Sequence, residues 1–262
     1  MGGASRKAGI LDNKKNLVMN KEDFIFGTRA IIEAIKNGKT VEKVLIKKGL
    51  NNELIKELNF LIRENNIATQ LVPVEKINRI TRKNHQGVIA FISPIVFDNI
   101  ENVLPGIYES GEQPLLLVLD QITDVRNFGA IVRSAECAGV QAIVIPEKGM
   151  ARIGADAVKT SAGALHHLPI CRVNNLFKTV QFLSDSGIHI VAATEKGEKL
   201  YTDANFNRPV AIVMGSEDDG ISKQILDIAN EQLKIPIRGK IESLNVSVSA
   251  ALMIYEAVRQ RG

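Results

Sequence analysis

Short apolar runs that alternate with helix-like segments constrain the fold of this chain more than any other feature. From residue 114 onward, runs with almost no polar side chain recur at 115–119, 142–145, 168–171, 188–192, 210–214 and 233–237. Runs of this length and character are typical of parallel strands that are buried on both faces. Segments with helical spacing separate them. We therefore expect residues 114–262 to form an α/β domain with a mostly parallel sheet.

The first half of the chain predicts a smaller α/β unit over residues 22–93. A helix is expected to begin at Thr28, which would cap it, and to end at Gly38. A second helix is expected at 53–64, and a third directly after Pro73. Strands are expected at 41–47, 68–72 and 88–92.

Two further segments lack the periodicity of a helix or strand. Residues 94–113 carry prolines and glycines, and we expect a linker there with one short helix at 100–104. Residues 1–21 are small, polar and basic, and we expect a disordered leader or arm. We find no signal peptide and no transmembrane run, so a cytoplasmic location is expected.

Charge is distributed unevenly between the two halves. Residues 1–92 carry 17 Lys and Arg against 9 Asp and Glu, a net charge of +8, whereas the remainder carries 16 against 20, a net charge of −4. A basic domain on an acidic one is typical of a protein that meets a polyanion. A merely soluble basic domain explains the charge equally well.

The two cysteines, Cys137 and Cys171, form no closely spaced pair. A disulfide framework and a zinc ribbon are therefore not expected, and a reducing compartment fits. We expect Cys137 to be a small buried hydrophobic residue and not a nucleophile.

Three loops follow apolar runs and concentrate residues that can carry chemistry. In open α/β sheets, ligands gather outside the carboxyl ends of the strands. The first loop and the helix after it carry Arg126, Asn127 and Arg133. Composition alone favours a solvated helix residue for Arg133 over a functional one.

The second loop, at 214–220, places Gly215 and Gly220 around the acidic triplet that begins at Glu217. Glycines allow the backbone to approach a ligand closely. The triplet could be a solvated turn or a cation site. Because the pair formed by His166 and His167 lies far away in the sequence, we expect no metal site.

The third loop leads into the last helix. Ser243 and Asn245 lie where the loop becomes helical and can cap its amides or hold a ligand. The run between Glu242 and Glu256 carries no charge, so this helix is expected to be buried on several sides. The glycine fingerprints of dinucleotide sites and P-loops are missing, as is the GxSxG nucleophile elbow.

The three loops together resemble the three motifs of the SpoU/TrmH family, which are RNA ribose 2′-O-methyltransferases of the SPOUT class. The matching stretches are N-F-G-A-I-V-R-S-A at 127–135, M-G-S-E-D-D-G-I at 214–221 and I-P-I-R-G-K-I-E-S-L-N-V-S-V-S-A at 235–250. The second departs from the family pattern G-N-E-G-x-G but keeps the glutamate. F-G-T-R-A-I-I-E-A-I and N-H-Q-G-V-I-A resemble the L30e-like substrate-binding domain of RlmB-type 23S rRNA enzymes.

This resemblance implies a fold, a cofactor and a set of site residues. It implies a SPOUT domain at 114–262 with a deep trefoil knot, an L30e-like RNA-binding domain at 22–93, and a homodimer. S-adenosyl-L-methionine is expected near Gly215, Ile235 and Leu244. The residues that match the catalytic set are Arg133, Asn127, Glu217, Ser243 and Asn245.

The expected reaction is methylation of the ribose 2′-hydroxyl of a guanosine in 23S rRNA. Arg133 is the candidate base, but neutralising an arginine at pH 7 costs about 8 kcal/mol. We favour a role in which Arg133 holds the target phosphate. Glu217 would orient Arg133 or its surrounding loop, Asn127 and Ser243 would fix neighbouring backbone, and Asn245 would support the loop before the last helix.

Three alternatives stay open. The first is a tRNA 2′-O-methyltransferase, although tRNA enzymes of this family usually carry short helical extensions in place of the basic domain. The second is an antibiotic-resistance rRNA methyltransferase that targets adenosine. The third is a non-catalytic RNA-binding factor for ribosome assembly, which titration with the cofactor would distinguish.

Overall fold

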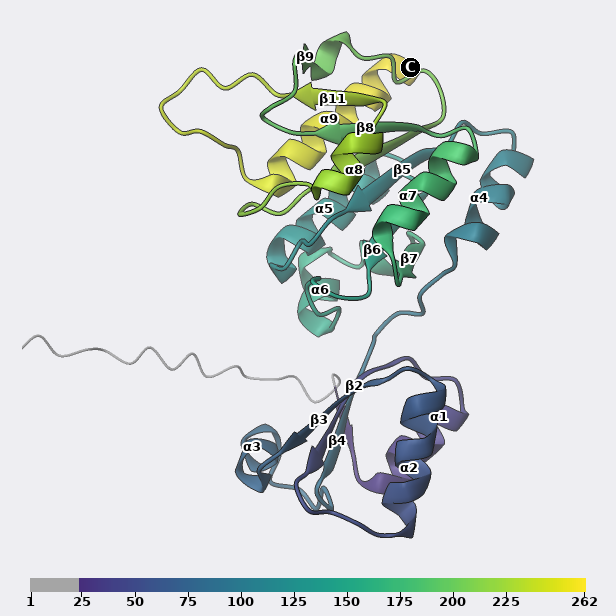
Figure 1. The fold of residues 1–262 in the computed structure, drawn as a ribbon, viewed down its shortest axis with the longest axis vertical. Helices are drawn as coiled ribbons and strands as arrows, with labels where there is room; N and C mark the ends of the chain where they lie inside the picture. The colour runs from purple at the N-terminus through teal and green to yellow at the C-terminus, as the bar shows by residue number, and fades with distance from the viewer. Residues whose placement is uncertain (1–23) are drawn as a thin grey trace, which may run out of the picture.

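The chain folds into two domains joined by a single connection (Figure 1). The structure, a computed structural model, describes residues 24–262. The predicted leader at 1–21 lies outside the described residues, as do the first two residues of the predicted basic domain.

The first domain is built on a mixed sheet. Within the described residues this sheet has four strands in the order β1-β4-β2-β3, and only β2 and β3 run parallel. The strands are β1 (Phe24–Phe26), β2 (Val41–Lys47), β3 (Ala68–Val72) and β4 (Val88–Ile92). The helices are α1 (Thr28–Lys36), α2 (Glu53–Glu64) and α3 (Val74–Ile80).

Alternate residues of the central strands face opposite sides of this sheet, as a pleated strand requires. Val44 and Ile46 pack against α1 and α2, whereas Leu45 packs with Ile77 of α3. The predicted helix cap is wrong by one residue. Gly27, with φ of 90°, occupies the cap position, and Thr28 is the buried first residue of α1.

The second domain is built on a parallel sheet, as the apolar runs predict. In the described part of the chain its seven strands lie in the order β7-β6-β5-β10-β8-β11-β9, and every pair is parallel. The strands are β5 (Leu115–Leu119), β6 (Ala142–Pro146), β7 (Ile170–Val173), β8 (His189–Ala193), β9 (Lys199–Leu200), β10 (Val210–Met214) and β11 (Glu231–Lys234).

Four of the six strand predictions in this sheet differ from the structure at their ends, and those at 142–145 and 188–192 differ by one residue. The strand predicted at 168–171 begins two residues later, and the strand predicted at 233–237 ends at Lys234. Ile235, Pro236 and Ile237 therefore belong to the loop before the last helix, because a proline cannot donate a ladder hydrogen bond. β9 was not predicted, since two residues carry no period.

Helices cover both faces of this sheet (Figure 1). One face carries α5 (Val125–Cys137), α6 (Ala155–Thr160), the 3-10 turn η1 (Ala164–His166) and α9 (Val246–Arg261). The other carries α4 (Ile100–Glu109), α7 (Leu176–Asp185) and α8 (Lys223–Ile228). A second 3-10 turn, η2 (Tyr201–Asp203), follows β9.

The segment predicted as a linker is largely part of the second domain. The short helix predicted at 100–104 extends to Glu109, through Pro105, and buries Ile107 in the core beside α7. Before it, Ile95 is buried against the opposite face, and Asp98 donates its backbone amide to Ile170 of β7 over 2.9 Å. These contacts anchor the connection to the edge of the sheet.

Arginines from the second domain hold the first. Arg172 of β7 makes a 2.6 Å ion pair with Glu42 of β2, and its guanidinium lies 3.5 Å from the ring centroid of Phe97. Arg152 lies 4.0 Å from the ring centroid of Phe91 in β4. The Arg172–Glu42 ion pair and the Arg152–Phe91 stack thus fix the domains against each other, whereas Phe97 holds Arg172 from the side of the second domain.

The last helix is less buried than its uncharged sequence predicts. α9 packs Ala250, Met253, Ile254 and Ala257 into the core, but Val248, Leu252 and Tyr255 are 48%, 36% and 49% exposed. One apolar face therefore lies open in the single chain.

The predicted burial of Cys137 is also wrong. Cys137 is exposed at the end of α5, and Cys171 is the buried one. Burial and the nearby Asp98 carboxylate raise the pKa of the Cys171 thiol to about 12. In the part of the chain that the structure describes, no helix is long and apolar enough to cross a membrane.

Candidate functional site

The site lies where the strand order of the parallel sheet changes direction. From β5 the chain continues to β6 and β7 on one side, then crosses to β8, β10 and β11 on the other. The backbone amide of Asp120, directly after β5, donates to the carbonyl of Met214 at the end of β10 over 2.8 Å. Ligands of open α/β sheets bind at such switch points.

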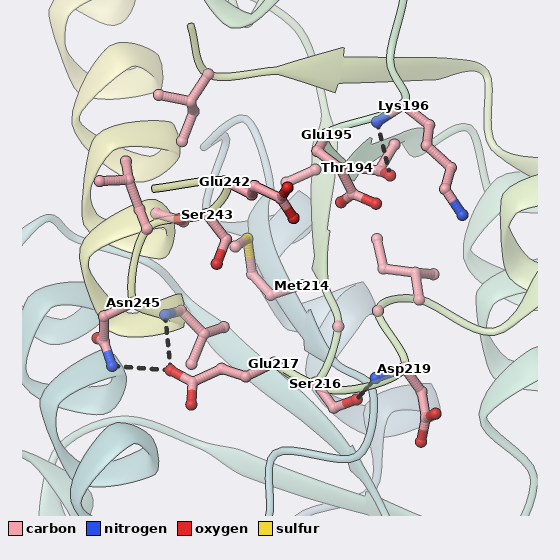
Figure 2. A pocket seen from close by; sticks show the side chains of 18 of the residues that line it. Thr194, Glu195, Lys196, Met214, Ser216, Glu217, Asp219, Glu242, Ser243 and Asn245 are labelled. Atoms are coloured by element: carbon pink, nitrogen blue, oxygen red, sulfur yellow. Dashed lines mark hydrogen bonds between the residues drawn. The ribbon is translucent and has the colours of Figure 1, made fainter. Parts of the chain in front are cut away.

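A pocket of about 550 Å³ opens at this edge (Figure 2). Its walls come from the loop after β10, the loop that leads into α9, and residues 193–196 after β8. The predicted residues that line it are Gly215, Glu217, Ile235, Ser243, Leu244 and Asn245. Asn127 and Arg133 do not line it.

Three predicted catalytic side chains form one hydrogen-bonded cluster beside the pocket. Asn245 donates its side-chain amide to Glu217 Oε1 over 2.8 Å and to Asn127 Oδ1 over 2.9 Å. Asn127 donates its own amide to the same Glu217 oxygen over 3.2 Å. Figure 2 shows Glu217 reaching from the β10 loop toward Asn245. The cluster therefore ties the three motif loops together.

Helix caps set the position of this cluster. Asp124 caps α5 by accepting the backbone amides of Arg126 and Asn127, which fixes Asn127 in the first turn. Asn245 caps α9 by accepting the amide of Ser247 over 3.0 Å. Because a capped first turn has little freedom, both amide side chains are presented in defined directions.

The loop after β10 requires glycine at its first position. Gly215 is buried, and a Cβ atom there would lie 2.1 Å from the backbone carbon of Gly220. Ser216 and Gly220 exchange two backbone hydrogen bonds of 3.1 Å, which close the acidic turn. The tight turn carries Glu217 to the mouth of the pocket.

Asp120, which directly follows β5, also anchors the loop after β10. This carboxylate is only 4% exposed and accepts the backbone amide of Ser222 over 2.8 Å. Because a buried carboxylate needs partners, Asp120 holds the loop in place. The sequence signal that could have identified Asp120 is its position directly after an apolar strand.

Arg133 stands apart from the cluster. It lies on the exposed side of α5 and has no hydrogen bond or ion pair with any residue that the structure describes. Glu217 accepts from Asn127, Asn245 and the backbone of Val246, so it orients the loops and not Arg133. The Arg133–Glu217 contact, one of the two roles considered for Glu217, is absent among the described residues.

Two other predicted roles need correction or lack support. Asn127 was expected to fix backbone, but its side chain bonds two other side chains. Ser243 lies at the pocket wall and is exposed, without a hydrogen bond to the described part of the chain.

Sequence reasoning missed the wall after β8. Thr194, Glu195 and Lys196 line the pocket opposite the α9 loop (Figure 2), and Thr194 Oγ1 accepts the amide of Lys196 over 3.3 Å. The signal was a polar loop after an apolar strand, followed by Gly197. A Cβ atom at Gly197 would lie 2.7 Å from the carbonyl oxygen of Gln232, so the backbones approach closely there.

The pocket is acidic with an apolar floor. One cation, Lys196, stands among five acids: Glu195, Glu217, Asp218, Asp219 and Glu242. Met214, Ile221 and Leu233 supply apolar surface. This combination suits a ligand with positive charge and one flat apolar group. Among the described residues, no group of three or more metal-ligating side chains is found.

Sequence comparison decides the family. A model of the SpoU rRNA Methylase family matches residues 114–255, more than half of the chain and the whole of the pocket. The chain belongs to the SpoU rRNA methylase family. A second model, described as RNA 2′-O ribose methyltransferase substrate binding, matches residues 24–96. This SpoU protein therefore pairs an RNA methyltransferase domain with a substrate-binding domain.

A relative of similar length supports the assignment. A protein of Staphylococcus saprophyticus, assigned to the TrmH family of tRNA/rRNA methyltransferases, is 35% identical over 245 residues. The match covers 92% of this SpoU protein and 97% of the relative. The likeness thus spans both domains.

Solved structures show the same fold. The SpoU methyltransferase AviRb of Streptomyces viridochromogenes, in complex with AdoMet, is 24% identical with a TM-score of 0.58, covering 91% of this chain and 90% of that one. An RNA 2′-O ribose methyltransferase is 28% identical with a TM-score of 0.54, covering 91% and 88%. A tRNA-modifying TrmH/SpoU enzyme of A. aeolicus, 30% identical with a TM-score of 0.52, covers only 62% of this chain and 84% of its own.

Proposed function

We propose that this SpoU protein transfers a methyl group from S-adenosyl-L-methionine to the ribose 2′-hydroxyl of a guanosine in 23S rRNA. The observation that carries the proposal is the Asn245–Glu217–Asn127 cluster, which joins the three family motifs at the mouth of an acidic pocket. The cofactor supplies an electrophilic methyl group on a sulfonium.

The residues present fit this cofactor. A pocket of about 550 Å³ lies within the usual size range for small-ligand sites. Its acidic wall complements a sulfonium and an ammonium group, and its apolar residues suit an adenine ring. We assign Gly215, Ile235 and Leu244 to the cofactor, because all three line the pocket.

The chain's own side chains would position the ribose. Arg133 is exposed on the helix that also carries Asn127, so its guanidinium is available to hold the phosphate of the target nucleotide. Neighbouring positive charge favours the ionised form of a hydroxyl and eases proton loss. Holding the reacting groups in place can contribute about 7–11 kcal/mol. Glu217, Asn127 and Asn245 would keep the loops in register, with Ser243 at the wall.

Ribosomal RNA is favoured over tRNA by the extent of the domain match. The tRNA-modifying enzyme of A. aeolicus covers 62% of this chain, and a structure described for 2-OH methylation of C/U34 on tRNA covers 56%. These two tRNA enzymes therefore leave more than a third of this chain unmatched. An rRNA methyltransferase from Sinorhizobium meliloti covers 90% of this chain with the same fold, and this shared two-domain layout supports the proposal of an rRNA substrate.

A homodimer accounts for the open face of α9. Val248, Leu252 and Tyr255 form a contiguous apolar strip at helical spacing, and a second copy of this chain would cover it. We further propose that the protein works in the cytoplasm, where ribosomal RNA is accessible. The trefoil knot expected for the family stays a prediction.

The test maps 2′-O-methyl positions in rRNA and tRNA from cells with and without the gene, with cells that carry only Glu217→Ala as the control. Loss of one guanosine methylation in 23S rRNA is the expected result. Loss of a tRNA methylation would instead identify the tRNA enzyme. If no position changes and calorimetry shows that the purified protein does not bind the cofactor, the non-catalytic alternative is correct.

A further inference from the structure

The two domains enclose a second cavity, of about 1060 Å³. We propose that this interdomain cleft binds a single-stranded RNA segment that flanks the target nucleotide. The proposal rests on the proposed function and extends it, because it names the surface that receives the substrate. The first domain contributes the start of β2, the turn before β3 and Phe91. The second contributes residues after β6 and β7.

The cleft and the cofactor pocket open at the same edge of the parallel sheet. Pro146 ends β6 and Asn174 follows β7, and both line the cleft. The pocket opens at the ends of β10, β8 and β11. β5 lies between the two groups, and neighbouring strands are about 4.8 Å apart. A strand of RNA that follows this edge would pass the start of α5, where Asn127 lies.

The two cavities carry opposite charge. The cleft has four cations, Lys43, Lys148, Arg152 and Arg172, against Glu42 and Glu147. Glu42 is already paired with Arg172. The cofactor pocket has one cation among five acids. Phosphates are therefore repelled from the pocket and attracted to the cleft, which separates RNA backbone from cofactor.

The cleft is held open by contacts within the protein. Arg172 is fixed both by its ion pair with Glu42 and by its position 3.5 Å from the ring centroid of Phe97. Because a guanidinium has two faces, one can lie on a phenylalanine while the other meets a base. The exposed amides of Asn66 and Asn174 offer donors and acceptors for base edges, whereas the amide of Asn65 already donates to the carbonyl of Leu61.

The size of the cleft selects the form of the RNA. Its volume is just above the usual range for small-ligand sites, so it can take a strand but not a duplex. Unpaired bases are the part of an RNA that proteins read by stacking and edge contacts. The expected occupant is therefore an unpaired segment of the substrate RNA.

The test removes two cleft lysines that form no ion pair with the part of the chain that the structure describes. The variant Lys43→Ala with Lys148→Ala is compared with a control, Lys56→Ala with Lys178→Ala, which removes two lysines on α2 and α7, outside the cleft. The probes are transcribed 23S rRNA and an oligouridylate of about ten nucleotides, a length within the site sizes of single-strand binders. Affinity is measured over a series of salt concentrations.

We expect the cleft variant to weaken binding of both probes on the order of tenfold at about 0.1 M salt. The slope of log affinity against log salt should fall in magnitude by about 1.4, or 0.7 for each lost contact. Cofactor affinity and Tm should match those of the control. If affinity and slope equal those of the control, the cleft does not bind RNA.

A third probe, an RNA hairpin duplex with the same charge as the oligouridylate, tests whether the cleft prefers single-stranded RNA. If the cleft variant loses affinity for the duplex but not for the oligouridylate, the single-strand assignment is wrong. Because all of these measurements record binding, they stand whether or not methyl transfer occurs. Methylation of 23S rRNA by a cleft variant with unchanged RNA affinity would refute the cleft and leave the proposed function intact.

Discussion

The side-chain amide of Asn245 lies 2.8 Å from Glu217 Oε1, and this hydrogen bond joins the loop after β10 to the start of α9. The same carboxylate oxygen also accepts the amide of Asn127 from α5 and the backbone amide of Val246. One oxygen thus holds three segments that are far apart in the sequence. The cluster therefore depends on the ability of this oxygen to accept several hydrogen bonds more than on the negative charge of Glu217.

Replacing Glu217 tests this relationship directly. Glu217→Ala removes the shared acceptor, and we expect kcat/KM for methyl transfer to fall on the order of 100-fold, because small displacements of positioning loops cost that much. Glu217→Gln keeps an acceptor oxygen at the same place and should retain most activity. Steady-state kinetics of both variants provide the check. Equal loss in both would mean that the negative charge itself is needed.

Substitutions of Arg133 distinguish a role in holding the phosphate from a role as the base that removes the proton. Arg133→Ala should effectively abolish methyl transfer, a loss of about 10²–10³-fold, with cofactor affinity near that of the wild type. Arg133→Lys should keep part of the rate and leave the pH–rate profile unshifted, since a cation that only holds a phosphate does not titrate. If the guanidinium were the base, the lysine variant, with a pKa near 10.4, would move the alkaline limb to lower pH. Calorimetry that shows a lost cofactor site in Arg133→Ala would contradict the assigned role.

The open face of α9 predicts a dimer that a single charge disrupts. Leu252→Asp places a carboxylate in the strip formed with Val248 and Tyr255, and the dissociation constant should rise on the order of 30-fold or more, equivalent to about 2 kcal/mol. Sedimentation over a range of protein concentrations measures the change. Leu71→Asp is the matched control, because Leu71 is 61% exposed on β3 of the other domain. Equal mass for both variants at every concentration would exclude α9 as the interface.

The carboxylate of Glu231, at the start of β11, should make the stability of the fold depend on pH. Burial would raise the pKa of Glu231, but the hydrogen bonds and charges of Lys199 and His189 outweigh it and lower the pKa below its ordinary value. A group with a lowered pKa stabilises the fold above its unfolded pKa, near 4.3, and this stabilisation is lost as the pH falls through the folded pKa.

Glu231→Gln should therefore lower Tm at pH 7 by about 2–4 °C, equivalent to about 1 kcal/mol. The difference from the wild type should shrink as the pH falls below about 4, because the wild-type carboxyl is then protonated as well. Thermal denaturation at pH 7, 5 and 3.5 measures both effects. A difference that stays constant over this range would show that the ion pairs do not stabilise the fold.

The alternation of apolar runs and helical segments was sufficient to predict the architecture. β2, α2, β3, β4, β5 and β10 occupy the residues predicted for them, because each is bounded by a clear change in periodicity. Errors occurred where tertiary contacts override local signals. α4 continues through Pro105 because Ile107 is buried beside α7. α9 looks uniformly buried in sequence, yet one of its faces is open.

The sequence by itself determined the strands, the helices and the residue types that gather at their ends, since periodicity and glycine placement are local properties. Only the tertiary structure decided which of those residues meet. It brought the amides of Asn127 and Asn245 to one carboxylate oxygen of Glu217 and left Arg133 outside this cluster. It also placed acidic side chains around the pocket and cationic side chains in the cleft. These relationships depend on the order of strands in the sheet, which the spacing of residues along the chain does not encode.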